Sequence, residues 1–112
     1  MELTVEPGAV LWASPDPSVG REQRGRRPVL VVSNVDYLET VATLALVVPL
    51  TTVDRGWDNH IRVTGEHGLG RETFAMTEQV RVVSRERFAA LSGCVDAATL
   101  AGVRRWLLDY LI

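Results

Sequence analysis

Two short, uninterrupted apolar runs constrain the fold of this chain more than any other feature. Residues 28–32 read PVLVV and residues 43–52 read TLALVVPLTT. Runs of this length that are rich in β-branched residues predict strands buried on both faces. Pro49 indicates a bulge or a sheet edge within the second run, because proline cannot donate a hydrogen bond to a ladder. Shorter strands are predicted over residues 8–14, 60–64 and 91–95, and one or two strands over residues 73–84.

The C-terminal segment has the period of a helix instead. Apolar residues recur there at intervals of three and four positions: Leu100, Val103, Leu107, Tyr110 and Leu111. This spacing predicts an amphipathic helix, with Asp96 as its N-cap. The expected fold is therefore mainly β with a C-terminal helix, a small and strongly curved antiparallel sheet or barrel capped by that helix. The 112 residues are expected to form a single domain, residues 1–112, around one hydrophobic core.

Composition excludes several classes of protein. The formal net charge is −2, so no global basic field indicates a nucleic-acid partner. No apolar run has the length of a membrane span, and the N-terminus lacks the pattern of a signal peptide. The single cysteine, Cys94, rules out an internal disulfide and fits a reducing compartment. We therefore expect a cytoplasmic protein without a membrane partner, with Cys94 as a small core residue.

The segment before the first long apolar run is rich in arginine. Residues 14–27 contain the proline, glycine and charged residues of a loop. Four arginines fall there within seven positions: Arg21, Arg24, Arg26 and Arg27. Such a cluster can simply be solvated, but Arg27 directly precedes Pro28 and the buried run, which fixes its backbone. A fixed guanidinium at the rim of a sheet is suited to binding a phosphodiester.

Three motifs follow one another along the chain. Residues 16–28 read DPSVGREQRGRRP, residues 46–52 read LVVPLTT, and residues 77–88 read TEQVRVVSRERF. The first resembles the D-P-x-x-G-x-E-Q-x-G-x-R-P loop of the MazF/PemK toxin endoribonucleases. The second resembles their next strand, which ends in a threonine or serine pair, and the third resembles their D/E-Q-x-R-x-I/V segment. The resemblance covers nearly the whole chain, in register.

The resemblance implies an SH3-like twisted antiparallel barrel that forms a homodimer. It also implies the toxin of a type II toxin–antitoxin system, an mRNA interferase that cleaves single-stranded RNA at specific sequences without metal. The products would carry 2′,3′-cyclic phosphate and 5′-hydroxyl ends, and translation and growth would be inhibited. The implied partner is a MazE-like antitoxin whose acidic, disordered tail occupies the RNA groove. No cofactor is expected, and the sequence offers no metal cluster: His60 and His67 lack matching ligands and are expected at the surface.

The resemblance also assigns roles to single residues. Arg27 matches the catalytic arginine and would stabilise charge on the scissile phosphate. Thr51 matches a threonine whose hydroxyl would donate to a phosphoryl oxygen or relay a proton, although β propensity alone also explains a threonine there. Glu22 matches a glutamate that would act as general base or orient Arg27, and Gln23 is expected to support the loop.

Further candidates lie outside this group. Glu78 matches an acidic position that some members use as a base, and Gln79 beside it would hold the loop or read a base edge. Trp57, in the loop that governs base recognition in the family, would stack on an unpaired base or pack within the loop. The remaining candidates for binding the RNA backbone are arginines, which could equally be solvated: Arg21, Arg24, Arg26, Arg81 and Arg85.

The chain departs from the PemK-like branch at two positions. That branch carries a histidine before the E-Q pair and an arginine two residues before the acidic position, where this chain has Arg21 and Met76. The catalytic scheme that uses those two residues does not transfer, which favours the scheme of Arg27, Thr51 and Glu22. Two alternative functions stay open: a toxin of the same fold that binds and inhibits DNA gyrase, a branch without the E-Q-x-G-x-R-P loop, and a catalytically inactive paralogue.

Overall fold

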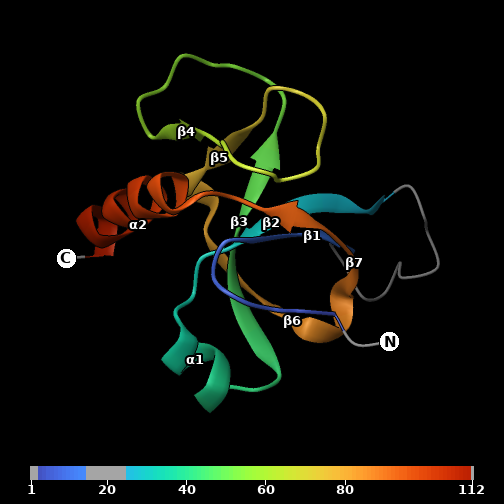
Figure 1. The fold of residues 1–112 in the computed structure, drawn as a ribbon. Coiled ribbons are helices and arrows are strands. Elements are labelled where there is room, and N and C mark those ends of the chain that lie inside the picture. Colours follow the sequence, from blue (N-terminus) through green and yellow to red (C-terminus); the bar gives the residue numbers. More distant parts are fainter. Residues whose placement is uncertain (1–2, 15–24, 112) are drawn as a thin grey trace.

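The computed structural model describes residues 3–14 and 25–111. This part of the chain consists of strands, two α-helices and short 3-10 turns (Figure 1). In chain order the elements are β1 (Ala9–Ala13), β2 (Arg27–Val31), α1 (Val35–Thr40), β3 (Leu44–Thr51), β4 (His60–Arg62), β5 (Phe74–Met76), η3 (Thr77–Gln79), β6 (Arg81–Ser84), η4 (Arg85–Arg87), β7 (Phe88–Cys94) and α2 (Ala97–Leu111).

The strands form one antiparallel sheet in the order β4-β5-β3-β2-β1-β7, and β6 pairs with the first half of β3. The two long apolar runs become β2 and β3 in the middle of this sheet, as predicted. On one edge, β3 pairs with β6 up to Val47 and with β5 from Leu50 onward. Pro49 lies between these two partners. The residue without an N–H therefore occupies an interruption of the ladder and not the outer edge of the sheet.

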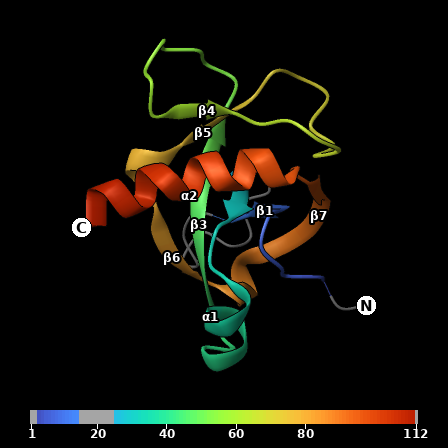
Figure 2. The same ribbon diagram turned by 60° about the vertical axis from the view of Figure 1, so that its left-hand side comes forward.

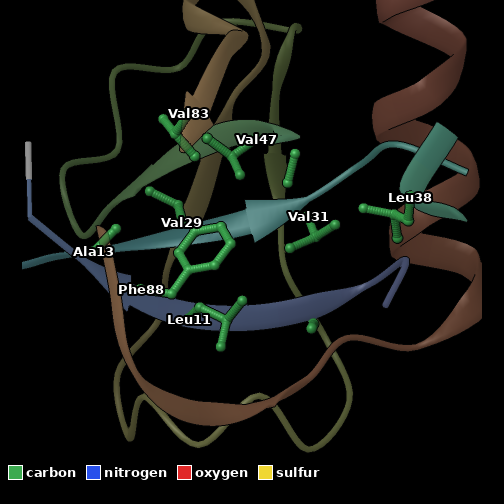
Figure 3. Close-up of a cluster of buried hydrophobic side chains, with 10 residues drawn as sticks. Leu11, Ala13, Val29, Val31, Leu38, Val47, Val83 and Phe88 are labelled. Atoms are coloured by element: carbon green, nitrogen blue, oxygen red, sulfur yellow. The ribbon is translucent and has the colours of Figure 1, made fainter. Parts of the chain in front are cut away.

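Buried side chains cover both faces of β2, which confirms the prediction from its continuous apolar run. Val29 and Val31 belong to a cluster that also contains Phe88 of β7 (Figure 3). Leu30, between them, belongs to a second cluster that includes Val103 of α2. Because successive side chains of a strand point to opposite faces, the two clusters lie on opposite sides of the sheet. Helix α2 crosses the second face (Figure 2).

The sheet is strongly twisted but does not close into a barrel. Of the two predicted forms, a curved sheet or a barrel, the structure shows the curved sheet. The predicted C-terminal helix is α2, and Asp96 is its N-cap, because Asp96 Oδ1 accepts a hydrogen bond from the backbone N of Thr99 at 2.9 Å. Hydrogen bonds from the Thr64 hydroxyl and the Thr99 backbone hold the pKa of Asp96 below its usual range. Tyr110, predicted on the apolar stripe, is exposed, and the side chain of Leu111 lies outside the described part.

Helix α1 is an element that the sequence pattern does not predict. It has only six residues, too few for a recognisable apolar period. Its N-cap is Asn34, whose Oδ1 accepts from the backbone N of Tyr37 at 2.8 Å. At its other end, the Arg85 guanidinium donates to the carbonyl oxygens of Leu38 and Val41. The structure thus uses Arg85 to hold the end of α1, which corrects the expectation that Arg85 contacts RNA.

The remaining comparisons concern the limits of the strands and the burial of Cys94. The interval 73–84 forms two strands, β5 and β6, separated by the turn η3, as the prediction of one or two strands allowed, whereas β7 begins earlier than predicted. Cys94 is exposed at the end of β7, so its prediction as a core residue is wrong. Among the described residues, no helix has both the length and the apolar character needed to cross a membrane.

Candidate active site

Arg27 and Thr51 are neighbours at one end of the sheet. Arg27 is the first residue of β2 and Thr51 is the last residue of β3. The two strands are antiparallel, with Val29 opposite Pro49, and continuing this register by two residues places Arg27 beside Thr51. Both residues line one pocket of about 320 Å³, called here the β2–β3 pocket. The structure therefore brings together two of the three residues predicted to carry the chemistry.

The Arg27 guanidinium is available to a ligand. Its backbone is fixed, because Arg27 pairs with Ala13 of β1. Its side chain is exposed, and within the described part of the chain it forms no ion pair. A permanently charged group on a fixed strand is suited to holding an anion. This arrangement fits the predicted contact between Arg27 and a phosphate.

The Thr51 hydroxyl donates no hydrogen bond to any of the described residues. Thr51 is half-buried, and its Oγ1 accepts a hydrogen bond from the backbone N of Val53 at 3.1 Å. A hydroxyl that accepts one bond can still donate its own hydrogen to another acceptor. The backbone contact also limits where Oγ1 lies. Thr51 can therefore present a donor into the β2–β3 pocket.

Arg71 is a lining residue of this pocket that sequence reasoning missed. It belongs to the β4–β5 loop (residues 63–73), and its carbonyl oxygen accepts from the hydroxyl of Thr73 at 2.9 Å. Because Phe74 of β5 pairs with Thr51, the end of this loop is carried to the pocket. The side chain is exposed and, among the described residues, has no acidic partner. The sequence showed only an arginine shortly before a predicted strand. Its position at the pocket depends on the pairing of β5 with β3, which the sequence does not specify.

Glu78 and Gln79 lie elsewhere, in the turn η3. Neither is among the described residues that line the β2–β3 pocket. The two oxygens of Glu78 lie 3.0 and 3.1 Å from Nε2 of His60, and Oε1 also accepts from Nδ2 of Asn59 at 2.9 Å. Gln79 Nε2 lies 3.5 Å from Glu78 Oε2. Partial burial raises the pKa of Glu78, but hydrogen bonds and attraction from His60 outweigh it, so the pKa lies below the ordinary 4.5.

His60 is buried, so the expectation of a surface histidine is wrong for this residue. Its side chain is 2% exposed, and the Glu78 carboxylate supplies a polar partner for Nε2, whereas Nδ1 is buried without a hydrogen bond within the described part of the chain. His67 is half-buried, and its Nδ1 accepts from the backbone N of Leu69 at 3.2 Å. No group of three potential metal ligands occurs among the described residues.

Trp57 is 52% exposed in the β3–β4 loop (residues 52–59). Its ring lies 4.9 Å from the His60 ring, centroid to centroid, at an interplanar angle of 53°. The guanidinium carbon of Arg55 lies 5.9 Å from the Trp57 ring centroid. The Trp57 ring therefore contacts His60 and Arg55, and about half of the residue remains exposed to solvent. These contacts are compatible with both of its predicted roles.

Two other predicted arginines, Arg81 and Arg26, line hollows separate from the β2–β3 pocket. Arg81 is exposed at the start of β6 and shares a small hollow of about 70 Å³ with Arg27 and Arg87. Arg26 is exposed and lines a separate hollow with Arg87. Four predicted site residues lie outside the described residues: Arg21, Glu22, Gln23 and Arg24.

Two curated endoribonucleases are similar to this chain in sequence. It is 33% identical over 89 residues to the endoribonuclease toxin MazF of Escherichia coli (strain K12), which covers 79% of this chain and 77% of that protein. It is 31% identical over 88 residues to the endoribonuclease EndoA of Bacillus subtilis (strain 168), covering 76% and 75% of the two chains. These relatives give the enzyme class, an endoribonuclease.

Solved structures give the same fold. MazF (Form-I) from Deinococcus radiodurans superposes with a TM-score of 0.77 at 28% identity, over 98% of both chains. The MazE-MazF complex (Form-II) from the same organism superposes with a TM-score of 0.77 at 23% identity, over 98% of this chain and 97% of that one. The sequence match to the family of PemK-like, MazF-like toxins extends over residues 6–111. The chain therefore belongs to the PemK-like, MazF-like toxins of type II toxin-antitoxin systems.

Proposed function

We propose that this toxin cleaves single-stranded RNA at specific sequences, without a metal ion, and leaves 2′,3′-cyclic phosphate and 5′-hydroxyl ends. The observation that carries the proposal is the β2–β3 pocket, in which Arg27 and Thr51 lie side by side, the arginine without an ion pair and the hydroxyl without an acceptor among the described residues. Cleavage of mRNA by such a site would inhibit translation and growth. The reducing cytoplasm is the compartment in which this substrate is found.

The proposed reaction uses the RNA's own 2′-hydroxyl. Its oxygen attacks the adjacent phosphorus, the O2′–P bond forms, and the P–O5′ bond breaks. The 2′-hydroxyl proton passes to a base, for which Glu22 is our candidate, and the departing 5′-oxygen takes up a proton from water. Because the attacking group belongs to the sugar, DNA is not a substrate.

Arg27 and Thr51 act on the phosphoryl oxygens in this scheme. Negative charge builds up on these oxygens as the fifth bond to phosphorus forms. A fixed guanidinium and a hydroxyl donor stabilise that charge more than they stabilise the ground state, which lowers the barrier. Arg71, which lines the same pocket, would add a second positive charge. It would hold the scissile phosphate or the next one along the strand.

Binding of the rest of the strand is assigned to residues around the pocket. Arg26 and Arg81, both exposed, would contact backbone phosphates, and Trp57 would stack on an unpaired base. Arg21 and Arg24 would add further phosphate contacts, and Gln23 would support their loop. Gln79 would read a base edge. Such contacts supply affinity and sequence preference, whereas the chemistry remains with the pocket.

The proposed protein partner is a MazE-like antitoxin with an acidic, disordered segment. MazF of Deinococcus radiodurans has been solved together with MazE. In this chain, the exposed arginines of the pocket would attract an acidic segment and be covered by it. Saturating antitoxin should then abolish RNA binding. Unchanged RNA cleavage at a saturating antitoxin ratio would contradict competition for this site.

We also propose a homodimer. Val82 of β6 and Leu108 of α2 are 49% and 57% exposed. They border an apolar hollow of about 510 Å³, which is a surface that a second copy could cover. Sedimentation equilibrium of the toxin alone tests this proposal. A monomer at micromolar concentration would contradict it.

The test of the proposed activity is digestion of a long, weakly structured RNA in excess EDTA, with mapping of every cut end. We expect cuts confined to one short sequence. Activity that disappears with chelation and returns with magnesium would contradict the metal-free mechanism. Absence of cleavage under all conditions, with antitoxin binding intact, would instead identify an inactive paralogue.

A further inference from the structure

The β3–β4 loop starts at the pocket and ends in a network of polar contacts. Thr52, its first residue, lines the β2–β3 pocket. This loop and the β4–β5 loop project from the same end of the sheet (Figures 1 and 2). Trp57 is the large apolar side chain that the β3–β4 loop exposes close to its end. Whatever fixes the end of this loop therefore also fixes Trp57.

The fixing contacts centre on Glu78, and we call this group the Glu78 anchor: Asn59, His60, Thr77 and Glu78. The Glu78 carboxylate accepts from Asn59 Nδ2 at 2.9 Å and lies 3.0 Å from His60 Nε2. The Thr77 hydroxyl donates to the carbonyl oxygen of Asn59 at 2.7 Å. The anchor thus joins the last residue of the loop and the first residue of β4 to the turn η3.

The anchor reaches Trp57 through two contacts. The backbone N of His60 donates to the carbonyl oxygen of Trp57 at 3.1 Å. The His60 ring, buried beneath, packs against the Trp57 ring with centroids 4.9 Å apart. Because the His60 side chain is 2% exposed, moving its ring aside would break the contacts between Nε2 and Glu78. The position of the Trp57 ring is therefore coupled to the carboxylate of Glu78.

We propose that Glu78 is a positioning residue that, through His60 and Asn59, holds Trp57 as a fixed platform on which an unpaired RNA base stacks. This inference rests on the proposed function, because it concerns how the same enzyme holds its RNA. It assigns to Glu78 a role different from the general base that the family resemblance suggests. It also gives a role to His60, which is not among the described residues that line the β2–β3 pocket.

The contacts of Glu78 favour positioning over proton abstraction. Both carboxylate oxygens lie within 3.1 Å of His60 Nε2, and one also accepts from Asn59, so a 2′-hydroxyl would have to compete with these contacts for the carboxylate. The lowered pKa of Glu78 makes its carboxylate a weaker base than an ordinary glutamate. The residue is also absent from the described lining of the β2–β3 pocket.

The test uses Glu78→Gln, with Glu72→Gln as the matched control. Glu72 pairs with Arg62 at 3.1 Å, but both side chains are more than half exposed, so the control removes an equal charge from an exposed pair. In the protein without RNA, amide hydrogen exchange over residues 53–59 should be faster in Glu78→Gln than in wild type. The control should leave it unchanged. Equal exchange in Glu78→Gln and wild type would overturn the proposed anchor.

Binding and cleavage then separate positioning from catalysis. The binding probe is a single-stranded RNA that carries a 2′-deoxy sugar at the cleaved position. Loss of the Trp57 platform in Trp57→Ala should weaken binding about 5- to 150-fold. Glu78→Gln should weaken it roughly three- to tenfold, as a partial loss of the same stacking. In a Trp57→Ala background, Glu78→Gln should have almost no further effect, because the platform is already gone.

Single-turnover cleavage at saturating RNA should be almost the same for Glu78→Gln and wild type. A large fall in that rate would overturn the inference and make Glu78 catalytic. An undiminished binding effect in the Trp57→Ala background would also overturn it, since Glu78 would not act through Trp57. Wild-type protein that neither binds nor cleaves RNA would overturn the proposed function, and the exchange experiment would still decide whether Glu78 fixes the loop.

Discussion

Replacing Arg27 by alanine should greatly slow cleavage while leaving the fold intact. Removal of one preorganised donor from a transition state typically costs about 2.7–4 kcal/mol, a rate loss of roughly a hundred- to thousandfold. Two features of the structure favour the lower end of this range of rate losses. Arg27 is exposed, so water screens part of its charge, and Arg71 remains in the same pocket. We therefore expect a loss of about a hundredfold, or about 2.7 kcal/mol.

Arg26→Ala is the matched control for this change. Arg26 is the preceding residue, is also exposed, and lines a different hollow. Its loss should weaken RNA binding modestly and reduce the salt dependence of binding by about one unit of slope. At saturating RNA its single-turnover rate should be near normal. Neither variant should change the free energy of unfolding by more than about 0.5 kcal/mol, because neither side chain is buried.

The assay is single-turnover cleavage at saturating RNA, followed by binding of an RNA with a 2′-deoxy sugar at the cut site. Thermal unfolding of each variant shows that both are folded. Equal single-turnover rates for Arg27→Ala and wild type would refute the reasoning. Arg27 would then be one more residue that binds the RNA backbone, and the chemistry would have to be assigned to Glu22 or Thr51.

Three other results are expected. Thr51→Val, which keeps the shape and removes the hydroxyl, should lower the single-turnover rate, whereas Thr51→Ser should retain most of it; equal rates for both variants would remove the hydroxyl from the mechanism. Leu30→Ala should lower the free energy of unfolding in urea by about 2–5 kcal/mol, because Leu30 is fully buried, whereas exposed Leu91→Ala should have little effect. The folded-state pKa of Glu78 is lowered, so its stabilising contribution is complete above pH 4.5 and is lost as the pH falls through that lower pKa. Urea unfolding should accordingly show a difference between wild type and Glu78→Gln that shrinks in acid, and a constant difference would contradict this sign.

Strands and their partners were predictable to different degrees. The runs that become β2 and β3 were predictable because a strand with both faces buried must be apolar at every position. The short helix α1 was not, because it is defined by the Asn34 cap and by Arg85, which is far away in the sequence. The break between β5 and β6 depends equally on local turn geometry at η3.

The residues of the candidate site were also predictable to different degrees. The family motif named Arg27 and Thr51 separately, and the antiparallel pairing of β2 with β3 places them side by side. Arg71 could not be predicted, since it reaches the pocket only through the pairing of β5 with β3. The burial of His60 depends on Glu78, eighteen positions further along the chain, and no local pattern reveals such a partner. Long-range pairing, rather than local propensity, decides these positions.

The chemistry itself is tested most directly by removing a single oxygen from the substrate. Two RNAs of the same sequence are compared in excess EDTA, one natural and one with a 2′-deoxy sugar immediately before the cleaved bond. We expect the natural RNA to be cut there to a 2′,3′-cyclic phosphate and a 5′-hydroxyl, and the modified RNA to remain intact at that bond. Cleavage of the modified bond at the same rate, or products with a 5′-phosphate, would contradict internal attack by the 2′-hydroxyl in the β2–β3 pocket.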